Sequence, residues 1–264
     1  MQRKPINFIK MSGSGNDFIV VDNRSGIVKH ASLFAKKNCR KNGTDGLLLV
    51  VKSTRRGGAD FGMIYYNSDG SRASFCGNGA RCIALFAYRN KITPAKMSFD
   101  SDAGLISAEV KHNSTVKIKM PRPVNHRQGF GLAVSGRNYE ASFINTGVPH
   151  TVIFVKDVDK INVKKLGRAI RWHKKFQPAG TNVNFAKVIG KNKLQVRTYE
   201  RGVEAETLAC GTGITASAII AVLEKYVKSP VSILTKGGEV LKVYFDGRTA
   251  YLEGKVKVLS EGKI

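Results

Sequence analysis

The sequence predicts an α+β protein of two pseudo-symmetric lobes, each a curved, mostly antiparallel β-sheet or barrel wrapped around a central helix. Three observations support this prediction. Short apolar-polar alternations run through most of the 264 residues, as half-buried strands require. Two segments, "GNGARCIALFAYRNK" and "GTGITASAIIAVLEKY", are apolar on nearly every side. Each begins directly after a cysteine and with Gly-x-Gly, so the chain contains the same arrangement twice.

The predicted strands are of two kinds. Continuous apolar runs such as "DFIVVDNR" and "GLLLVVK" indicate central strands that are covered on both faces. The alternating segments indicate strands with one solvent-facing side. These alternating segments span residues 116–120, 194–200, 239–245 and 251–258.

Both apolar segments are too short to cross a membrane, and a helix that is apolar all round must be enclosed. Each is therefore expected as a helix surrounded by the sheet of its own lobe. A third helix, amphipathic and basic, is predicted within "DKINVKKLGRAIRWHKKF".

The repeat extends upstream of each cysteine. A Tyr, a polar residue (Asn67 or Glu200) and then a turn glycine precede Cys76 and Cys210. The Pro-containing stretch "MPRPVN" separates the two copies. The N-terminal lobe is expected to span residues 1–120 and carry Cys76, with the last strand at about 254–264 as a candidate member. The C-terminal lobe is expected to span 121–253 and carry Cys210.

Composition restricts the function classes. The chain is 42% hydrophobic, which predicts a folded globular protein. It contains no apolar run of membrane-spanning length and no secretory signal pattern, so we expect a cytoplasmic protein without a membrane partner. The net charge of +25 could indicate nucleic-acid binding. However, the basic residues are spread along the chain without an RNA-binding motif, so no nucleic-acid partner is expected.

The four cysteines are expected to be thiols rather than disulfides in a reducing compartment. The sequence has no CxxC or HxxxH pair, so no metal site is predicted. Cys39 and Cys82 are interpreted as small buried apolar residues. The same interpretation is open for Cys76 and Cys210 individually, but their repeated sequence context favours a chemical role.

A cysteine at a helix N-terminus meets unpaired amide groups and the positive end of the helix dipole, which lowers a thiol pKa. The glycines that follow leave the same amides accessible to a carboxylate. Two such helix ends suit the inversion of a stereocentre, because one group removes a proton from one face while another delivers a proton to the opposite face. The sequence thus predicts a two-thiol epimerase or racemase.

The motifs "MSGSGNDFIVVDNR", "YNSDGSRASFCGNGARC", "NTGVPH", "TNVNF" and "YERGVEAETLACGTG" together resemble the diaminopimelate epimerase family along almost the whole chain. The resemblance implies cofactor-free interconversion of LL- and meso-diaminopimelate, a step towards lysine and, in many bacteria, peptidoglycan. It implies a small-molecule substrate and leaves a homodimer open as the assembly. No cofactor is expected.

The resemblance also implies roles for individual residues. Cys76 would be the proton donor and Cys210 the acceptor in the LL-to-meso direction. His150 and Glu200 would orient and balance the reacting ammonium. The helix-end amides would hold the reacting carboxylate, and Arg201 would suit a distal carboxylate. The helix-end residues are Gly77, Asn78, Gly211 and Thr212, and the remaining substrate-binding residues are Asn16, Asn67, Asn182, Glu200 and Arg201.

Structural roles are open for several of these residues. His150 could cap a turn, Asn16 and Asn67 could form Asx-turns, and Glu200-Arg201 could be a surface pair. The chain also departs from the family pattern: Val148 stands where many members carry Asn, Ser12 where His is frequent, and "RGVEAET" is one residue longer than the commonest form. Proline racemase-like and phenazine-biosynthesis-like enzymes are the alternatives within the same fold.

Overall fold

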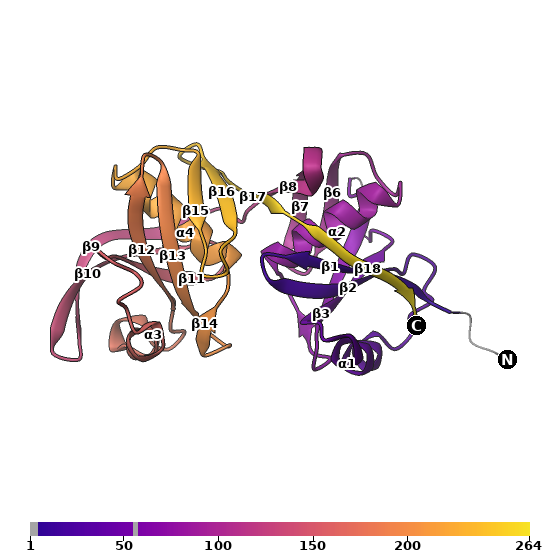
Figure 1. Ribbon diagram of the computed structural model, residues 1–264, viewed down its shortest axis with the longest axis horizontal. Coiled ribbons are helices and arrows are strands. Elements are labelled where there is room, and N and C mark those ends of the chain that lie inside the picture. Colours follow the sequence, from indigo (N-terminus) through magenta and orange to yellow (C-terminus); the bar gives the residue numbers. More distant parts are fainter. Residues whose placement is uncertain (1–4, 55–57) are drawn as a thin grey trace. The chain divides into compact units, whose positions relative to one another are not determined.

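The computed structural model describes residues 5–54 and 58–264 and divides the chain into two compact units (Figure 1). Unit 1 contains the chain up to Ile118 together with Glu253–Ile264, and unit 2 contains Lys119–Leu252. Each unit combines a mostly antiparallel sheet with two α-helices, as predicted for the fold class. The last strand therefore pairs within the N-terminal half of the chain.

Within its described residues, unit 1 contains nine strands and the helices α1 and α2. Its elements are β1 (Asn7–Gly13), β2 (Asn16–Asp22), α1 (Ala31–Asn42), β3 (Gly46–Val51), β4 (Phe61–Asn67), β5 (Arg72–Ala73), α2 (Gly77–Arg89), β6 (Lys96–Ser101), β7 (Gly104–Val110), β8 (Thr115–Lys119) and β18 (Lys257–Lys263). β2 pairs parallel with β3, and β4 with β6. These two parallel pairs are joined by α1 and α2, because a parallel connection needs a crossover. The strand pairs β1–β18, β1–β2, β3–β4, β4–β5, β6–β7 and β7–β8 are antiparallel.

Unit 2 repeats this order. Its elements are β9 (Val124–Val134), β10 (Arg137–Asn145), β11 (Pro149–Phe154), α3 (Val163–Arg171), β12 (Asn182–Gly190), β13 (Lys193–Glu200), β14 (Ala205–Thr207), α4 (Gly211–Leu223), β15 (Val231–Leu234), β16 (Val240–Phe245) and β17 (Ala250–Lys255). The parallel pairs are β11–β12, joined by α3, and β13–β15, joined by α4. The antiparallel pairs include β9–β10, β10–β11, β12–β13, β13–β14 and β15–β16.

The register makes the two units comparable position by position. In unit 1, Gly46 pairs with Phe18 on β2 and with Asn67 on β4. In unit 2, Asn182 pairs with His150 on β11, and the next residue of β12 pairs with Tyr199 on β13. Continuing that register places Asn182 beside Glu200. Phe18, Gly46 and Asn67 therefore correspond to His150, Asn182 and Glu200.

The central helices are the two apolar segments that the sequence predicts. In α2 every residue from Gly77 to Ala87 is buried, and the helix packs against β1, β2, β3 and β7. In α4 every residue from Gly213 to Ala221 is buried, and the helix packs against β10, β11, β12 and β16. Because each helix is enclosed by the sheet of its own unit, only its ends are available for chemistry (Figure 1).

The two remaining helices lie outside the sheets of their units. α3 is the predicted basic helix and packs against β12 and β13. α1 was not predicted, because only Ala35, Asn38 and Cys39 of its residues are buried and its apolar positions form no long stripe. Its one clear sequence signal is Gly43, which ends the helix in the left-handed conformation (φ 57°).

Two further findings bear on function. Among the described residues, no helix combines the length and apolar character needed to cross a membrane. In the same part of the chain, no group of three or more His, Cys, Asp or Glu side chains is arranged to hold a metal ion.

Candidate active site

Most of the predicted site residues of each unit lie at one edge of its sheet. In unit 1, β2 and β3 begin at this edge and β4 ends there, which gathers Asn16, Gly46 and Asn67. In unit 2, β11 and β12 begin and β13 ends at the equivalent edge, which gathers His150, Asn182 and Glu200.

Cys76 is the N-cap of α2. Its backbone is extended (φ −142°, ψ 116°), and its sulfur accepts a hydrogen bond of 3.4 Å from the Gly79 amide. The amides of Gly77 and Asn78 follow in the first turn, where helical amides have no acceptor within their own helix. The helix end thus combines a sulfur atom with amide donors, as the sequence predicts.

A chain of hydrogen bonds positions the side chains around this helix end. The fully buried Arg81 donates to the side-chain oxygens of Asn78 (3.0 Å) and Ser14 (2.6 Å). Asn78 Nδ2 donates to Asn16 Oδ1 (2.7 Å), and Asn16 Nδ2 donates to Asp45 Oδ2 (3.3 Å). A guanidinium has only donors and a carboxylate only acceptors, so the two ends determine the orientation of both amides. Asn16 therefore retains one free N–H and one lone pair for a ligand.

Asn67 is part of a turn at the end of β4. Its Nδ2 donates to Ser71 Oγ (3.0 Å), and its backbone amide donates to Ser71 O (2.8 Å). The side chain thus helps to close the turn that leads to Cys76, although it acts through its nitrogen and not through the oxygen that an Asx-turn uses.

Cys210 occupies the N-cap position of α4, as Cys76 does in α2, but its side chain makes no cap hydrogen bond to an amide of the helix. Its backbone is also extended (φ −108°, ψ 107°), and its side chain is 6% exposed. The sulfur lies 3.5 Å from Thr212 Oγ1, and Thr146 Oγ1 donates to the Thr212 carbonyl (3.0 Å). Gly211 and Thr212 occupy the first turn, in the positions that Gly77 and Asn78 occupy in α2.

Glu200 is an ionisable group beside Cys210. Burial raises the pKa of the Glu200 carboxyl, and its side-chain interactions with Thr207 and Cys210 act in the opposite direction. A carboxyl group with a raised pKa that contacts a thiol is suited to exchanging a proton with it. Glu200 is therefore a largely buried carboxyl in contact with a cysteine, rather than one half of an exposed surface pair.

His150 is completely buried on β11. Burial, together with the positive charge of Arg201, lowers the pKa of His150 to about 3, so the imidazole is neutral at physiological pH. Its Nδ1 lies 3.1 Å from Asn184 Nδ2. Its Nε2 has no hydrogen-bond partner among the residues that the structure describes.

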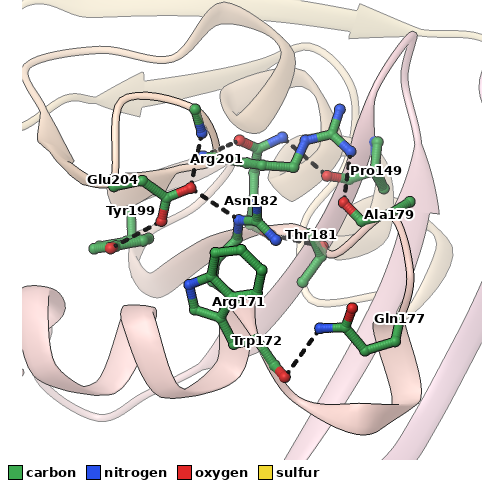
Figure 2. A network of polar contacts seen from close by, with 11 residues as sticks. Pro149, Arg171, Trp172, Gln177, Ala179, Thr181, Asn182, Tyr199, Arg201 and Glu204 are labelled. Atoms are coloured by element: carbon green, nitrogen blue, oxygen red, sulfur yellow. Dashed lines mark hydrogen bonds and ion pairs between the residues drawn. The ribbon is translucent and has the colours of Figure 1, made fainter.

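Asn182 and Arg201 are joined by a hydrogen bond (Figure 2). Asn182 Oδ1 accepts from the Arg201 amide (2.8 Å), and its Nδ2 donates to the Pro149 carbonyl (2.9 Å). Asn182 is 3% exposed, so it chiefly joins the start of β11 to the end of β13. The Arg201 guanidinium donates to the Ala179 carbonyl (3.0 Å) and lines a pocket of about 310 Å³ together with Arg127 and Lys175. These three cations make the pocket suitable for an anionic group.

Two of the departures from the family pattern, Val148 and the longer loop, can be described from their local contacts. Val148 is partly exposed, and its carbonyl accepts from the Thr146 amide (3.2 Å), but its apolar side chain offers no polar contact to a ligand. The loop in "RGVEAET" is held by Glu204, whose carboxylate accepts from Arg171 (3.2 Å), Tyr199 (3.2 Å) and the Gly202 amide (3.1 Å) (Figure 2). The longer loop is therefore anchored to the unit.

Known proteins resemble this chain in sequence and in fold. The family model for diaminopimelate epimerase matches residues 8–125 and 142–259, one segment in each half of the chain. A diaminopimelate epimerase from Aquifex aeolicus (strain VF5) is 46% identical, with 98% of each chain covered. One from Methanocella arvoryzae is 39% identical, with 98% of this chain and 96% of that protein covered.

The chain belongs to the diaminopimelate epimerase family. Solved structures at lower identity show the same fold. A phenazine biosynthesis protein of the PhzF family from Bacillus anthracis superimposes with a TM-score of 0.74 at 15% identity, with 99% of each chain covered. A probable proline racemase from Agrobacterium radiobacter K84 gives 0.68 at 14% identity, with 98% of this chain and 92% of that chain covered.

Several further residues that contact the candidate site residues were not predicted. They are Ser14, Asp45 and Arg81 in unit 1 and Asn184, Thr198 and Gly213 in unit 2. Arg81 was detectable as a charge inside an otherwise apolar helix, and Asn184 as an amide in a buried strand. Asp45 and Thr198 have no such signal, because their roles depend on pairing between strands.

The third residue of each central helix is a glycine that lies close to a side chain of the surrounding sheet. A Cβ at Gly213 would lie 2.3 Å from Asn184 Oδ1, whereas one at Gly79 would lie 3.2 Å from a Leu48 methyl group. We expect Gly213→Ala to destabilise the protein by about 1–3 kcal/mol through overpacking. Gly79→Ala should cost less, because a leucine methyl can shift and alanine favours a helix. Urea unfolding of both variants measures the difference, and equal costs would contradict this account.

The buried histidine predicts a pH dependence of stability. Between pH about 6.5 and about 3 the unfolded chain binds a proton at His150 that the folded chain does not bind. The free energy of unfolding should therefore decrease as the pH falls through this range, by up to about 1.4 kcal/mol per pH unit. His150→Gln, which does not titrate, should show a correspondingly shallower dependence in urea unfolding. Parallel curves for the parent and His150→Gln would show that His150 does not contribute.

Proposed function

We propose that this protein epimerises one stereocentre of 2,6-diaminopimelate, converting the LL form to the meso form on the route to lysine, with Cys76 and Cys210 as the two acid–base groups. The observation that supports this most strongly is the repeated cysteine cap. In a chain of the diaminopimelate epimerase family, both units place a cysteine at the N-terminus of an enclosed helix.

In the proposed reaction the Cys210 thiolate removes the α-proton from one face, and the Cys76 thiol delivers a proton to the other face. The electron pair of the broken C–H bond passes into the carboxylate as enolate-like charge and returns to form the new C–H bond. The two thiols end in exchanged protonation states and are reset by proton exchange with solvent.

The helix-end amides would stabilise the charge that develops on the reacting carboxylate. Gly77-Asn78 and Gly211-Thr212 supply first-turn N–H groups that have no intrahelical acceptor. Such donors and the thiols are sufficient for the proposed proton transfers, so the proposal includes no cofactor or metal. A cytoplasmic location is part of the same proposal, and a homodimer is the proposed assembly.

Glu200 and Arg201 divide the recognition of the two ends of the substrate. Glu200 contacts Cys210 and would accept hydrogen bonds from the ammonium at the reacting carbon. Arg201 lines the basic pocket with Arg127 and Lys175 and would bind the distal carboxylate. Asn16 and Asn67 each retain an amide hydrogen that would donate to the substrate. Asn182 would position Arg201 by accepting a hydrogen bond from its backbone amide.

The first test removes one thiol at a time. Cys76→Ala and Cys210→Ala should each reduce epimerisation of LL-diaminopimelate by at least about a thousandfold, because a positioned acid or base contributes roughly 10²–10⁴-fold and one thiol cannot serve both faces. Cys39→Ala, which changes a buried thiol in α1, is the matched control and should retain activity. The parent should incorporate one solvent deuterium at the inverted carbon in D₂O, as read by mass spectrometry. Full activity in either single variant would exclude the two-thiol mechanism.

The second test concerns the distal carboxylate. Arg201→Met should lower kcat/KM for diaminopimelate by at least about a hundredfold, on the order of 3 kcal/mol, because the carboxylate loses its charged partner. Arg168→Met, at an exposed arginine of α3, is the control and should leave kcat/KM unchanged. A parent enzyme that racemises proline as well as it epimerises diaminopimelate, or an Arg201→Met variant as active as the parent, would show that the site does not recognise a distal carboxylate.

A further inference from the structure

Asn184 is a fully buried amide directly behind His150. Its Nδ2 lies 3.1 Å from the Thr151 carbonyl and 3.1 Å from His150 Nδ1, and its Oδ1 accepts from Thr198 Oγ1 (2.9 Å). The side chain thus contacts β11 and β13 from its position on β12, and it has no assigned role in the proposed reaction.

These partners determine which way the amide faces. A backbone carbonyl only accepts, so the group that faces Thr151 must be the NH₂ group. The same NH₂ group has a second hydrogen, and this hydrogen is directed at His150 Nδ1. Nδ1 must then be the unprotonated nitrogen, because a donor cannot face another donor. In a neutral imidazole the proton is therefore on Nε2.

Resting on the proposed function, we propose that Asn184 is a positioning residue that holds His150 as the neutral Nε2–H tautomer, so that His150 acts in the reaction as a hydrogen-bond donor. Nε2 is buried and has no acceptor among the described residues, so this donor is available. It suits an anion such as a carboxylate or a thiolate. An ammonium has only donors, so it would pair with Glu200 and not with His150.

The repeat shows that this amide is not needed to build the fold. By register, Phe18 and Leu48 of unit 1 correspond to His150 and Asn184 of unit 2. The same backbone arrangement therefore exists with an apolar pair. In unit 1, Gly79 of α2 faces Leu48.

The third residue of α4 makes close approach to the polar pair. A Cβ at Gly213 would lie 2.3 Å from Asn184 Oδ1 and 3.3 Å from His150 Cε1. Gly213 is also three residues after Cys210, in the first turn of the helix. Asn184 and His150 thus pack against the first turn of α4, which begins at Cys210. The position of the imidazole proton can therefore affect the group that we propose to transfer the substrate proton.

The test reads the tautomer and the kinetics separately. In ¹H–¹⁵N NMR spectra of the substrate-free parent, with His150→Gln used to assign the signal, we expect Nε2 to be protonated and Nδ1 unprotonated. Asn184→Asp presents only acceptors and should move the proton to Nδ1 or charge the ring. Asn184→Leu copies unit 1 and should leave a mixture of tautomers. In both variants kcat should fall by at least about tenfold, with a smaller change in KM.

Asn38→Leu is the control, because Asn38 is a buried amide of α1 that donates to the Phe34 carbonyl (2.9 Å). It should leave the tautomer and kcat unchanged even if it lowers Tm. An Nδ1–H tautomer in the parent, or variants that lose the Nε2–H tautomer yet keep the parent kcat, would overturn the proposal. Failure of the parent to act on diaminopimelate would instead refute the proposed function, and the tautomer measurement would still stand.

Discussion

The constraint on which both half-sites depend is the N-terminus of an enclosed helix. The first amides of α2 and α4 have no acceptor within their helices, and a buried donor without a partner costs roughly 1–3 kcal/mol. Most helices meet this requirement with a hydroxyl or carboxylate cap. Here a cysteine occupies the cap and glycine follows it, so the sulfur satisfies little of the amide capacity. The remaining amides can bind a carboxylate, so the residues that begin each helix also form a candidate anion site.

Because the backbone repeats, the differences between the units lie in side chains. The sheet edge and the helix cap are the same in both units, whereas Phe18 and Asn67 of unit 1 stand where His150 and Glu200 stand in unit 2. Unit 1 therefore supplies its thiol with neutral neighbours at these positions, and unit 2 supplies its thiol with a carboxyl group. Two thiols in equivalent backbone positions need not be equivalent acids, since the pKa of each depends on the charges nearby.

The repeat, the enclosed helices and the two cysteine caps could be predicted from sequence because each has a strong local pattern. α1 could not, since a helix with three buried residues has little periodic signal. The fine roles at the site were also beyond the sequence. Asn182 matched the substrate-binding set, yet its amide is largely used to join Pro149 to Arg201. Such roles depend on strand register, and register is set by long-range pairing rather than by neighbours in sequence.

The hydrogen-bond chains in both units are oriented by groups that can only donate or can only accept hydrogen bonds. In unit 1 the chain runs from a guanidinium through two amides to a carboxylate, from Arg81 to Asp45. In unit 2 a backbone carbonyl, that of Thr151, orients Asn184 and hence the imidazole of His150. An amide or imidazole can present either a donor or an acceptor to a ligand, so its specificity depends on what holds its other side. By ending each chain in a group that cannot reverse its polarity, the protein fixes the orientation of these amides and of the imidazole before a ligand binds. The residues that set this polarity lie behind the side chains proposed to bind substrate, so a search limited to side chains that touch a ligand would overlook them.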